Sequence, residues 1–247
     1  MPDHIRQLAA ALSGAFSGPR LSALPPESAP RDEAEAYAVQ TAVLGGEAVA
    51  GWKVAPIRNG VIRTAPLAAS RLLPDGGALP AGLVDPLLEV ELALRLAQDV
   101  PDRATPDQVL AALGDLCVAF EILDSRFASI SAVPALTGLA DAQSNRAFVA
   151  GSVGVPWNTV EMATVPLSIF GDDQLLQQAK AGPSSAQVVE AVIWLADHAA
   201  QRGVPLRRGQ IIITGARLGP MPIPPGRQIR ATGGGIGEVH VVTPTRR

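Results

Sequence analysis

The segment from Asp85 to Asp99 constrains the fold more than any other, because apolar and other side chains alternate along it. The apolar positions are Leu88, Val90, Leu92, Leu94 and Leu96. A period of two predicts a β-strand with one face in the core. Glu89 and Glu91 then point to the same side, with Cα atoms about 6.5–7 Å apart. Two such carboxylates either face water or share a cation, and the pattern alone favours water.

Glu121 is a second unusual carboxylate, because it interrupts the apolar run from Val118 to Leu123. An unpaired charge is costly to bury, so this group must be paired, protonated or bound to a metal. Arg126 is the nearest ion-pair partner in the sequence, and taken alone that pair is the slightly better interpretation. With Glu89 and Glu91 on an adjacent strand, however, three carboxylates form an all-oxygen site suited to Mg²⁺ or Mn²⁺.

The remaining patterns predict an α+β protein with a largely β core. Asp32, Thr105 and Ser184 each carry a Glu or Gln three residues later, which predicts capped helix starts. Helices are expected over 4–17, 33–44, 106–114 and 185–202, and strands over 50–55, 88–96, 117–123, 147–151, 211–214 and 236–242, with weak strands at 163–170. Residues 56–86, rich in proline, are expected to form an irregular loop. Because the strands are not in βαβ order, the α+β class is favoured over α/β.

Composition limits the classes of function. The net charge of −3 without a long basic run argues against a nucleic-acid partner, and no apolar run reaches the length of a membrane span. The single cysteine, Cys117, lies in an apolar run and is expected to be a buried thiol, which indicates a cytoplasmic protein. Lys53 and Lys180 are the only lysines in an arginine-rich chain. Lysine, unlike arginine, can give up a proton when its environment lowers its pKa.

An ordered set of short motifs resembles the fumarylacetoacetate hydrolase superfamily, and within it the 2-keto-4-pentenoate hydratase and 4-oxalocrotonate decarboxylase branch. The motifs are Gly51-Trp52-Lys53-Val54, Glu89-Val90-Glu91, Glu121-Ile122-Leu123-Asp124-Ser125-Arg126, Ala140-Asp141-Ala142-Gln143-Ser144 and Thr214-Gly215-Ala216. The resemblance implies one catalytic domain over residues 1–247, with a helical part (1–50) and a mixed β-roll (51–247). It also implies a homo-oligomer, with a decarboxylase or hydratase of the same pathway as a further partner.

The resemblance further implies that Glu89, Glu91 and Glu121 ligate Mg²⁺ or Mn²⁺. Lys53 would face a small 2-oxo acid substrate as an acid–base group. Ser144, Thr214 and Gly215 are the expected substrate-binding residues, although a turn or strand end explains each of them equally well.

Two parts of the chain depart from this branch. Residues 177–184 are only loosely similar to a Gly-rich segment that precedes the late helix in the branch. The loop before the Glu-x-Glu strand also departs from the branch. Its members carry an acidic residue in the loop before the Glu-x-Glu strand, where this chain has Leu67-Ala68-Ala69-Ser70 and then Asp75. A second acid–base residue is therefore not identified, and the region of Ser70 and Asp75 is where we would expect it.

The first expected reaction is hydration of a 2-hydroxy-2,4-dienoate, and the second is decarboxylation of a 2-oxo-enedioate. Hydrolysis of a C–C bond, as in acylpyruvate hydrolases, is less favoured, because that reaction needs a base such as histidine and no histidine lies between residues 5 and 197. A non-catalytic subunit that binds 2-oxo acids is the alternative from another class.

Overall fold

The computed structural model describes residues 1–55, 60–129, 133–179 and 181–245. Its helices are α1 (Asp3–Gly14), α2 (Glu33–Leu44), α3 (Pro106–Ala112), α4 (Ala135–Ala140) and α5 (Ser185–Gln201). Its strands are β1 (Val49–Val54), β2 (Thr64–Ala68), β3 (Leu72–Leu73), β4 (Leu87–Leu96), β5 (Leu113–Leu123), β6 (Asn145–Ala150), β7 (Val155–Pro156), β8 (Leu167–Gly171), β9 (Gln174–Ala179), β10 (Ile211–Pro222), β11 (Gln228–Gly233) and β12 (Gly237–Val242). Lys180 lies outside the described residues.

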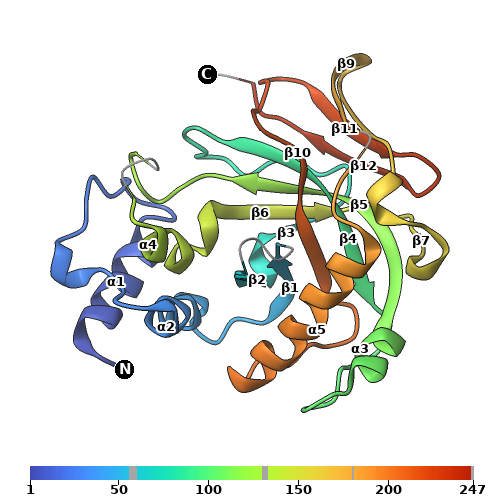
Figure 1. The fold of residues 1–247 in the computed structure, drawn as a ribbon. Helices are drawn as coiled ribbons and strands as arrows, with labels where there is room; N and C mark the ends of the chain where they lie inside the picture. Colours follow the sequence, from blue (N-terminus) through green and yellow to red (C-terminus); the bar gives the residue numbers. More distant parts are fainter. Residues whose placement is uncertain (56–59, 130–132, 180, 246–247) are drawn as a thin grey trace.

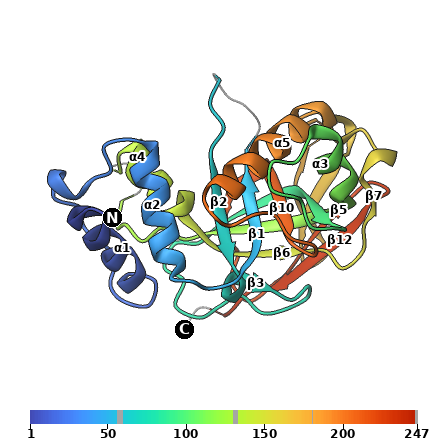
Figure 2. The same ribbon diagram turned by 90° about the horizontal axis from the view of Figure 1, so that it is seen from below.

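The architecture is the predicted α+β arrangement with a largely β core (Figure 1). A curled sheet has the order β2-β1-β10-β4-β5-β6-β3, with β7 also paired to β5. A second sheet has the order β12-β11-β8-β9. Helices α1, α2 and α4 gather at one end of the molecule, whereas α3 and α5 lie together over the roll (Figure 2). Among the described residues, no helix is long and apolar enough to cross a membrane.

The predicted strand around Glu89 is β4, and it is central in the curled sheet. Its leucine and valine side chains point outward into the main core, which they share with α5 and the second sheet. On the opposite face, Ala93 joins a smaller core inside the curl. Gly51 on β1 shows how tightly the sheet curls, since a Cβ there would lie 3.1 Å from the ring of Phe148 on β6. These strands are not neighbours in the sheet, so the inner space is filled by side chains from across the roll.

Several predicted elements differ from the observed ones. The expected irregular loop at 56–86 contains β2 and β3, and β9, β11 and α4 were not predicted. The expected weak strands at 163–170 correspond to β8, which begins only at Leu167. The predicted caps at Asp32, Thr105 and Ser184 are all present, and the last two form complete capping boxes.

Candidate active site

The inward-facing side chains of the roll change from apolar to polar toward one end of the strands. On four strands, the inward-facing residues of the inner core are followed by inward-facing residues of the site. On β1, Gly51 is followed by Lys53, and on β4, Ala93 is followed by Glu91 and Glu89. On β5, Cys117 and Ala119 are followed by Glu121, and on β10, Ile211 and Ile213 are followed by Gly215. Because every second residue of a strand faces the same side, one end of the roll collects these polar groups. The apolar side chains of the inner core below them close the bottom of the site.

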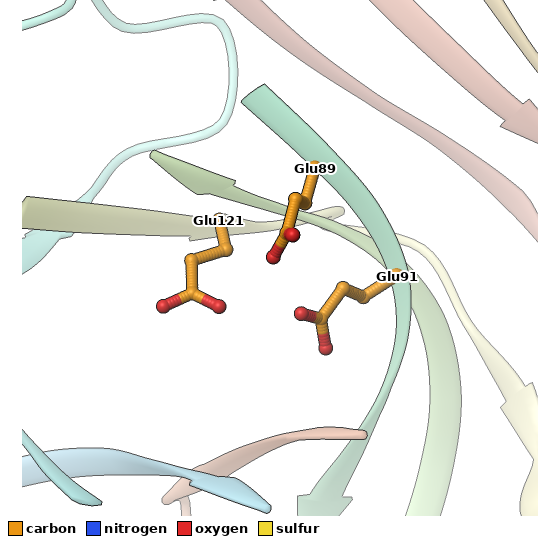
Figure 3. A group of neighbouring side chains, drawn as sticks. All are labelled: Glu89, Glu91 and Glu121. Carbon is orange, nitrogen blue, oxygen red and sulfur yellow. The ribbon is translucent and has the colours of Figure 1, made fainter. Parts of the chain in front are cut away.

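Three carboxylates meet at this end of the roll (Figure 3). Glu89 and Glu121 are direct cross-strand neighbours, and Glu91 follows two residues along β4. One oxygen from each of the three carboxylates lies within 4.8 Å of the others. Glu91 and Glu121 are fully buried, and Glu89 is half-buried. Like charges placed opposite each other on a sheet destabilise it, so this arrangement needs compensation.

The electrostatics of these carboxyl groups reflect that crowding. Burial, and then the charge of Glu121, raise the pKa of Glu89 to about 7, against a smaller opposing effect of Lys53. Burial, with the charges of Glu121 and Glu89, raises the pKa of Glu91 well above its usual value. Removing water and adding like charges both disfavour the ionised form. A proton or a bound cation at Glu89 and Glu91 therefore relieves this crowding.

Lys53 is the first of two groups that hold Glu121. Its Nζ lies 2.6 Å from Glu121 Oε1, and Asn145 Nδ2 donates to the same oxygen at 2.9 Å. The other oxygen, Oε2, is buried without a hydrogen-bond partner in the described part of the chain. Arg126 does not pair with Glu121, because its guanidinium is bound to Asp141. The alternative of a Glu121–Arg126 ion pair is therefore wrong.

The three carboxylates have the composition of a site for a hard divalent cation. Mg²⁺, Mn²⁺ and Ca²⁺ bind carboxylate oxygens, and ligands on one ion lie close enough together to match the 4.8 Å limit found here. The unpartnered Oε2 of Glu121 is the kind of buried acceptor that a bound cation would satisfy. The chemistry of the donor set therefore fits such an ion.

A cavity of about 850 Å³ opens over the carboxylates. Its lining includes the three glutamates, Lys53 and Gly215, as the sequence predicts. It also includes residues that were not predicted: Arg63, Gln143, Gln187, Gly182 and Pro183. The volume lies in the range typical of small-molecule sites.

Two of the predicted substrate-binding residues do not line this cavity. The Thr214 hydroxyl is buried and donates to Leu92 O at 2.7 Å. Ser144 is buried, and its hydroxyl has no partner among the described residues. Gly215 does line the cavity, but its N–H donates to Glu91 Oε2 at 2.6 Å. The glycine thus orients a carboxylate of the site, and the predicted roles of Thr214 and Ser144 have no support from their positions.

The region expected to supply a second acid–base group lies elsewhere. The backbone N–H of Ser70 donates to Glu47, and the side chain is exposed. Asp75 accepts from the backbone N–H groups of Ser152 and His240. Neither residue lines the cavity.

Gln143 and Asn145 reach the site through an unusual turn. Ala142, Gln143 and Ser144 all have positive φ values, between 50° and 67°. Left-handed backbone costs about 1–2 kcal/mol per residue other than glycine, and such strain is often found at functional sites. Nothing in three non-glycine residues predicts this turn from the sequence. It brings Gln143 to the cavity wall and Asn145 against Glu121.

Curated proteins similar to this chain include hydratases and a decarboxylase. The 2-keto-4-pentenoate hydratase of Burkholderia vietnamiensis is 31% identical over 157 residues, which are 63% of this chain and 59% of that protein. The chain thus aligns with less than two thirds of that relative's length. The 2-keto-4-pentenoate hydratase of Paraburkholderia phymatum is 29% identical over 89% of both proteins. A 4-oxalocrotonate decarboxylase of Pseudomonas sp is 28% identical over 70% of this chain and 67% of that protein.

The solved structures agree with the predicted fold. The 4-oxalocrotonate decarboxylase of Pseudomonas putida G7, complexed with magnesium and adipate, has a TM-score of 0.82, with 20% identity and 97% of both chains covered. The fumarylpyruvate hydrolase of Pseudomonas aeruginosa, in complex with Mn²⁺ and pyruvate, has a TM-score of 0.57, with 15% identity over 79% of this chain and 89% of that one. No family model matches the chain.

Proposed function

We propose that this chain is a metal-dependent lyase of small 2-oxo and 2-hydroxydienoic acids. It is homologous to 2-keto-4-pentenoate hydratases and 4-oxalocrotonate decarboxylases, and it has the fold of the fumarylacetoacetate hydrolase superfamily. Hydration of a 2-hydroxy-2,4-dienoate to a 4-hydroxy-2-oxo acid is the proposed reaction. The observation that carries the proposal is the group of three carboxylates beside Lys53, in which Glu121 Oε2 is buried and unpartnered.

In this proposal Glu89, Glu91 and Glu121 hold a divalent ion, Mg²⁺ or Mn²⁺. When bound, the ion supplies Lewis-acid stabilisation of negative charge on the substrate's 2-oxo oxygen. Gly215 keeps Glu91 in place through its N–H, and Asn145 does the same for Glu121. The apolar side chains below the carboxylates exclude water from that side of the site.

Lys53 is the proposed acid–base residue. Its ammonium group lies at the cavity wall, and its contact with Glu121 fixes Nζ next to the carboxylates. Hydration requires that C3 and C5 of the substrate each gain a proton, while the 2-hydroxyl group and the attacking water each lose one. Lys53 Nζ is the cavity-lining group proposed to carry one of these protons, since a positioned acid or base must lie within hydrogen-bond reach of its target.

Decarboxylation of a 2-oxo-enedioate is the second candidate. It is favoured by the 4-oxalocrotonate decarboxylase that aligns with 70% of this chain. Both reactions start from a 2-oxo or 2-hydroxydienoic acid, so the same cavity suits either of them.

The test is a spectrophotometric assay of the purified protein with 2-hydroxypenta-2,4-dienoate and Mg²⁺. Loss of the dienol absorbance that stops on addition of a chelator is expected, with a 4-hydroxy-2-oxo acid as the product. Release of CO₂ from a 2-oxo-enedioate would instead show that the chain is a decarboxylase. Absence of turnover with all dienoates and oxo-enedioates would contradict the lyase and favour a non-catalytic 2-oxo-acid-binding subunit.

Location and assembly complete the proposal. We expect a cytoplasmic protein, consistent with the free buried thiol of Cys117. We also expect a homo-oligomer, which light scattering of the purified protein would detect.

A further inference from the structure

Arg63 is a second cation on the same cavity wall as Lys53. The hairpin register pairs Lys53 with Ala65 and Val54 with Thr64, and the Ala55 N–H donates to Arg63 O at 3.4 Å. Ala55 and Arg63 are therefore opposite each other, and directly opposite residues share a face of the sheet. Lys53, Ala55 and Arg63 all line the cavity. One two-residue repeat, about 6.5–7 Å, separates the level of Arg63 from that of Lys53.

Arg63 lies on the outer side of Lys53, away from the carboxylates. Moving along β1, the inward positions run from Gly51 in the inner core to Lys53, which contacts Glu121, and then to Ala55. The cavity wall therefore has the carboxylates on one side of Lys53 and Arg63 one two-residue repeat beyond Lys53 on the other. An elongated acid can contact both.

The guanidinium of Arg63 has few ion-pair or hydrogen-bond partners among the described residues. Its one ionic contact there is Nε to Glu33 Oε1 at 3.7 Å, and the two side chains are 39% and 45% exposed. Exposed ion pairs of this kind contribute little. Nε itself is buried and has no hydrogen-bond partner in the described part of the chain. A guanidinium with free donors is suited to bind a carboxylate through two parallel hydrogen bonds.

The other groups of the cavity do not compete for this role. Lys53 is occupied by Glu121, and the three glutamates are the proposed ligands of the cation. Gln143 and Gln187 line the wall without charge. Among the described residues that line the cavity, Arg63 is the cation that is not paired with a carboxylate of the site.

We propose that Arg63 is a specificity-determining residue that binds a second carboxylate at the far end of the substrate, so that the site favours dicarboxylic 2-oxo or 2-hydroxydienoic acids over monocarboxylic ones. This inference rests on the proposed function, since it assigns the carboxylate triad to the 2-oxo acid end of the substrate. It concerns a substrate whose far carboxylate is kept through the reaction, as in hydration; in decarboxylation that carboxylate leaves as CO₂.

The experiment measures binding and needs no turnover. Isothermal titration calorimetry with Mg²⁺ present compares 2-oxohexanedioate with 2-oxohexanoate, two acids of equal chain length that differ in the terminal carboxylate. The wild-type protein is expected to bind the dicarboxylic acid about tenfold or more tightly, as one charge-assisted contact provides. Arg63→Gln should lose this preference while binding 2-oxohexanoate as before. Arg63→Lys should keep part of this preference, because lysine retains the positive charge but cannot donate two parallel hydrogen bonds to one carboxylate.

Two further variants separate direct contact from general attraction of anions. Arg208→Gln removes the same charge from an exposed residue that does not line the cavity, and should leave the preference intact. Glu33→Gln removes the carboxylate 3.7 Å from Nε of Arg63, and because that exposed pair contributes little, the preference for the dicarboxylic acid should be kept.

The failures of the two proposals are distinguishable. Equal affinity of the wild-type protein for both acids, or an equal loss of both in Arg63→Gln, would overturn the role of Arg63 and leave the metal-dependent site standing. If neither acid binds in the presence of Mg²⁺, the proposed substrate class is wrong, and the role of Arg63 falls with it.

Discussion

The metal-free protein should lose stability as the pH rises from about 5.5 to about 8, and Mg²⁺ should restore it. The pKa of Glu89 is raised to about 7 by burial and by the charge of Glu121, and burial also raises that of Glu91 well above its usual value. A carboxyl group with a raised pKa binds its proton more tightly in the folded state than in the unfolded state. Its stabilising contribution is therefore complete below the unfolded value and is lost as the pH passes through the folded value.

The size of the effect follows from Glu89 alone. With pKa values of about 4.5 unfolded and about 7 folded, linkage gives a loss of about 2 kcal/mol between pH 5.5 and pH 8. Glu91 adds to this loss in the same direction. A cation that replaces the protons reverses it, and about 2.7 kcal/mol is regained when its concentration is about 100 times its Kd. Because protons compete with the cation, the gain should be larger at pH 8 than at pH 5.5.

The assay is denaturant unfolding at both pH values, with a chelator or with Mg²⁺, on the wild type and on Glu89→Gln. Subtracting the variant removes other titrating groups, such as His198, whose pKa burial lowers to about 4. The exposed Glu190→Gln on α5 is the matched control and should behave as the wild type does. The reasoning is refuted if the metal-free wild type and Glu89→Gln show the same pH dependence, or if Mg²⁺ stabilises both equally.

Local sequence signals predicted the parts of the fold that depend on few residues. The capping boxes at Thr105 and Ser184 form as expected, because a cap needs only its own turn. The β4 strand was predicted from its alternation, and alternation also fixes that Glu89 and Glu91 face the same side. The pairing of Glu89 with Glu121 depends on the register between β4 and β5, which periodicity does not predict. The ordered motifs of the resemblance predicted that the two glutamates lie together.

The missed strands have physical explanations. Pro66 made the segment around β2 resemble a loop, yet β2 is an edge strand, where proline costs no ladder hydrogen bond. β9 is also an edge strand and is rich in exposed glutamine, so it lacks a buried face to produce an apolar pattern. Edge strands of this kind are therefore not predicted from hydrophobic periodicity.

The parts of the site that escaped prediction depend on tertiary register. Arg63 reaches the wall because the β1–β2 hairpin sets it opposite Ala55, and no local pattern around it indicates a binding residue. Asn145 reaches Glu121 through a left-handed turn built without glycine. Thr214 and Ser144 were implied by a motif, but the motif carries no information on which way a hydroxyl points.

Two further substitutions test the site. Lys53→Met should lower kcat by about 10²–10⁴, while thermal shifts show that Mg²⁺ still binds; a loss below about tenfold would remove Lys53 from proton transfer. Gly182→Ala places a methyl group against Nε of the half-buried Arg217, whose Nη2 donates to Pro183 O at 3.1 Å. Overpacking should cost about 1–3 kcal/mol in unfolding free energy and raise KM, because Gly182 and Pro183 form the cavity wall. Gly138→Ala has open space and should be neutral or slightly stabilising; equal effects of the two alanine substitutions would show that Arg217 does not support the wall.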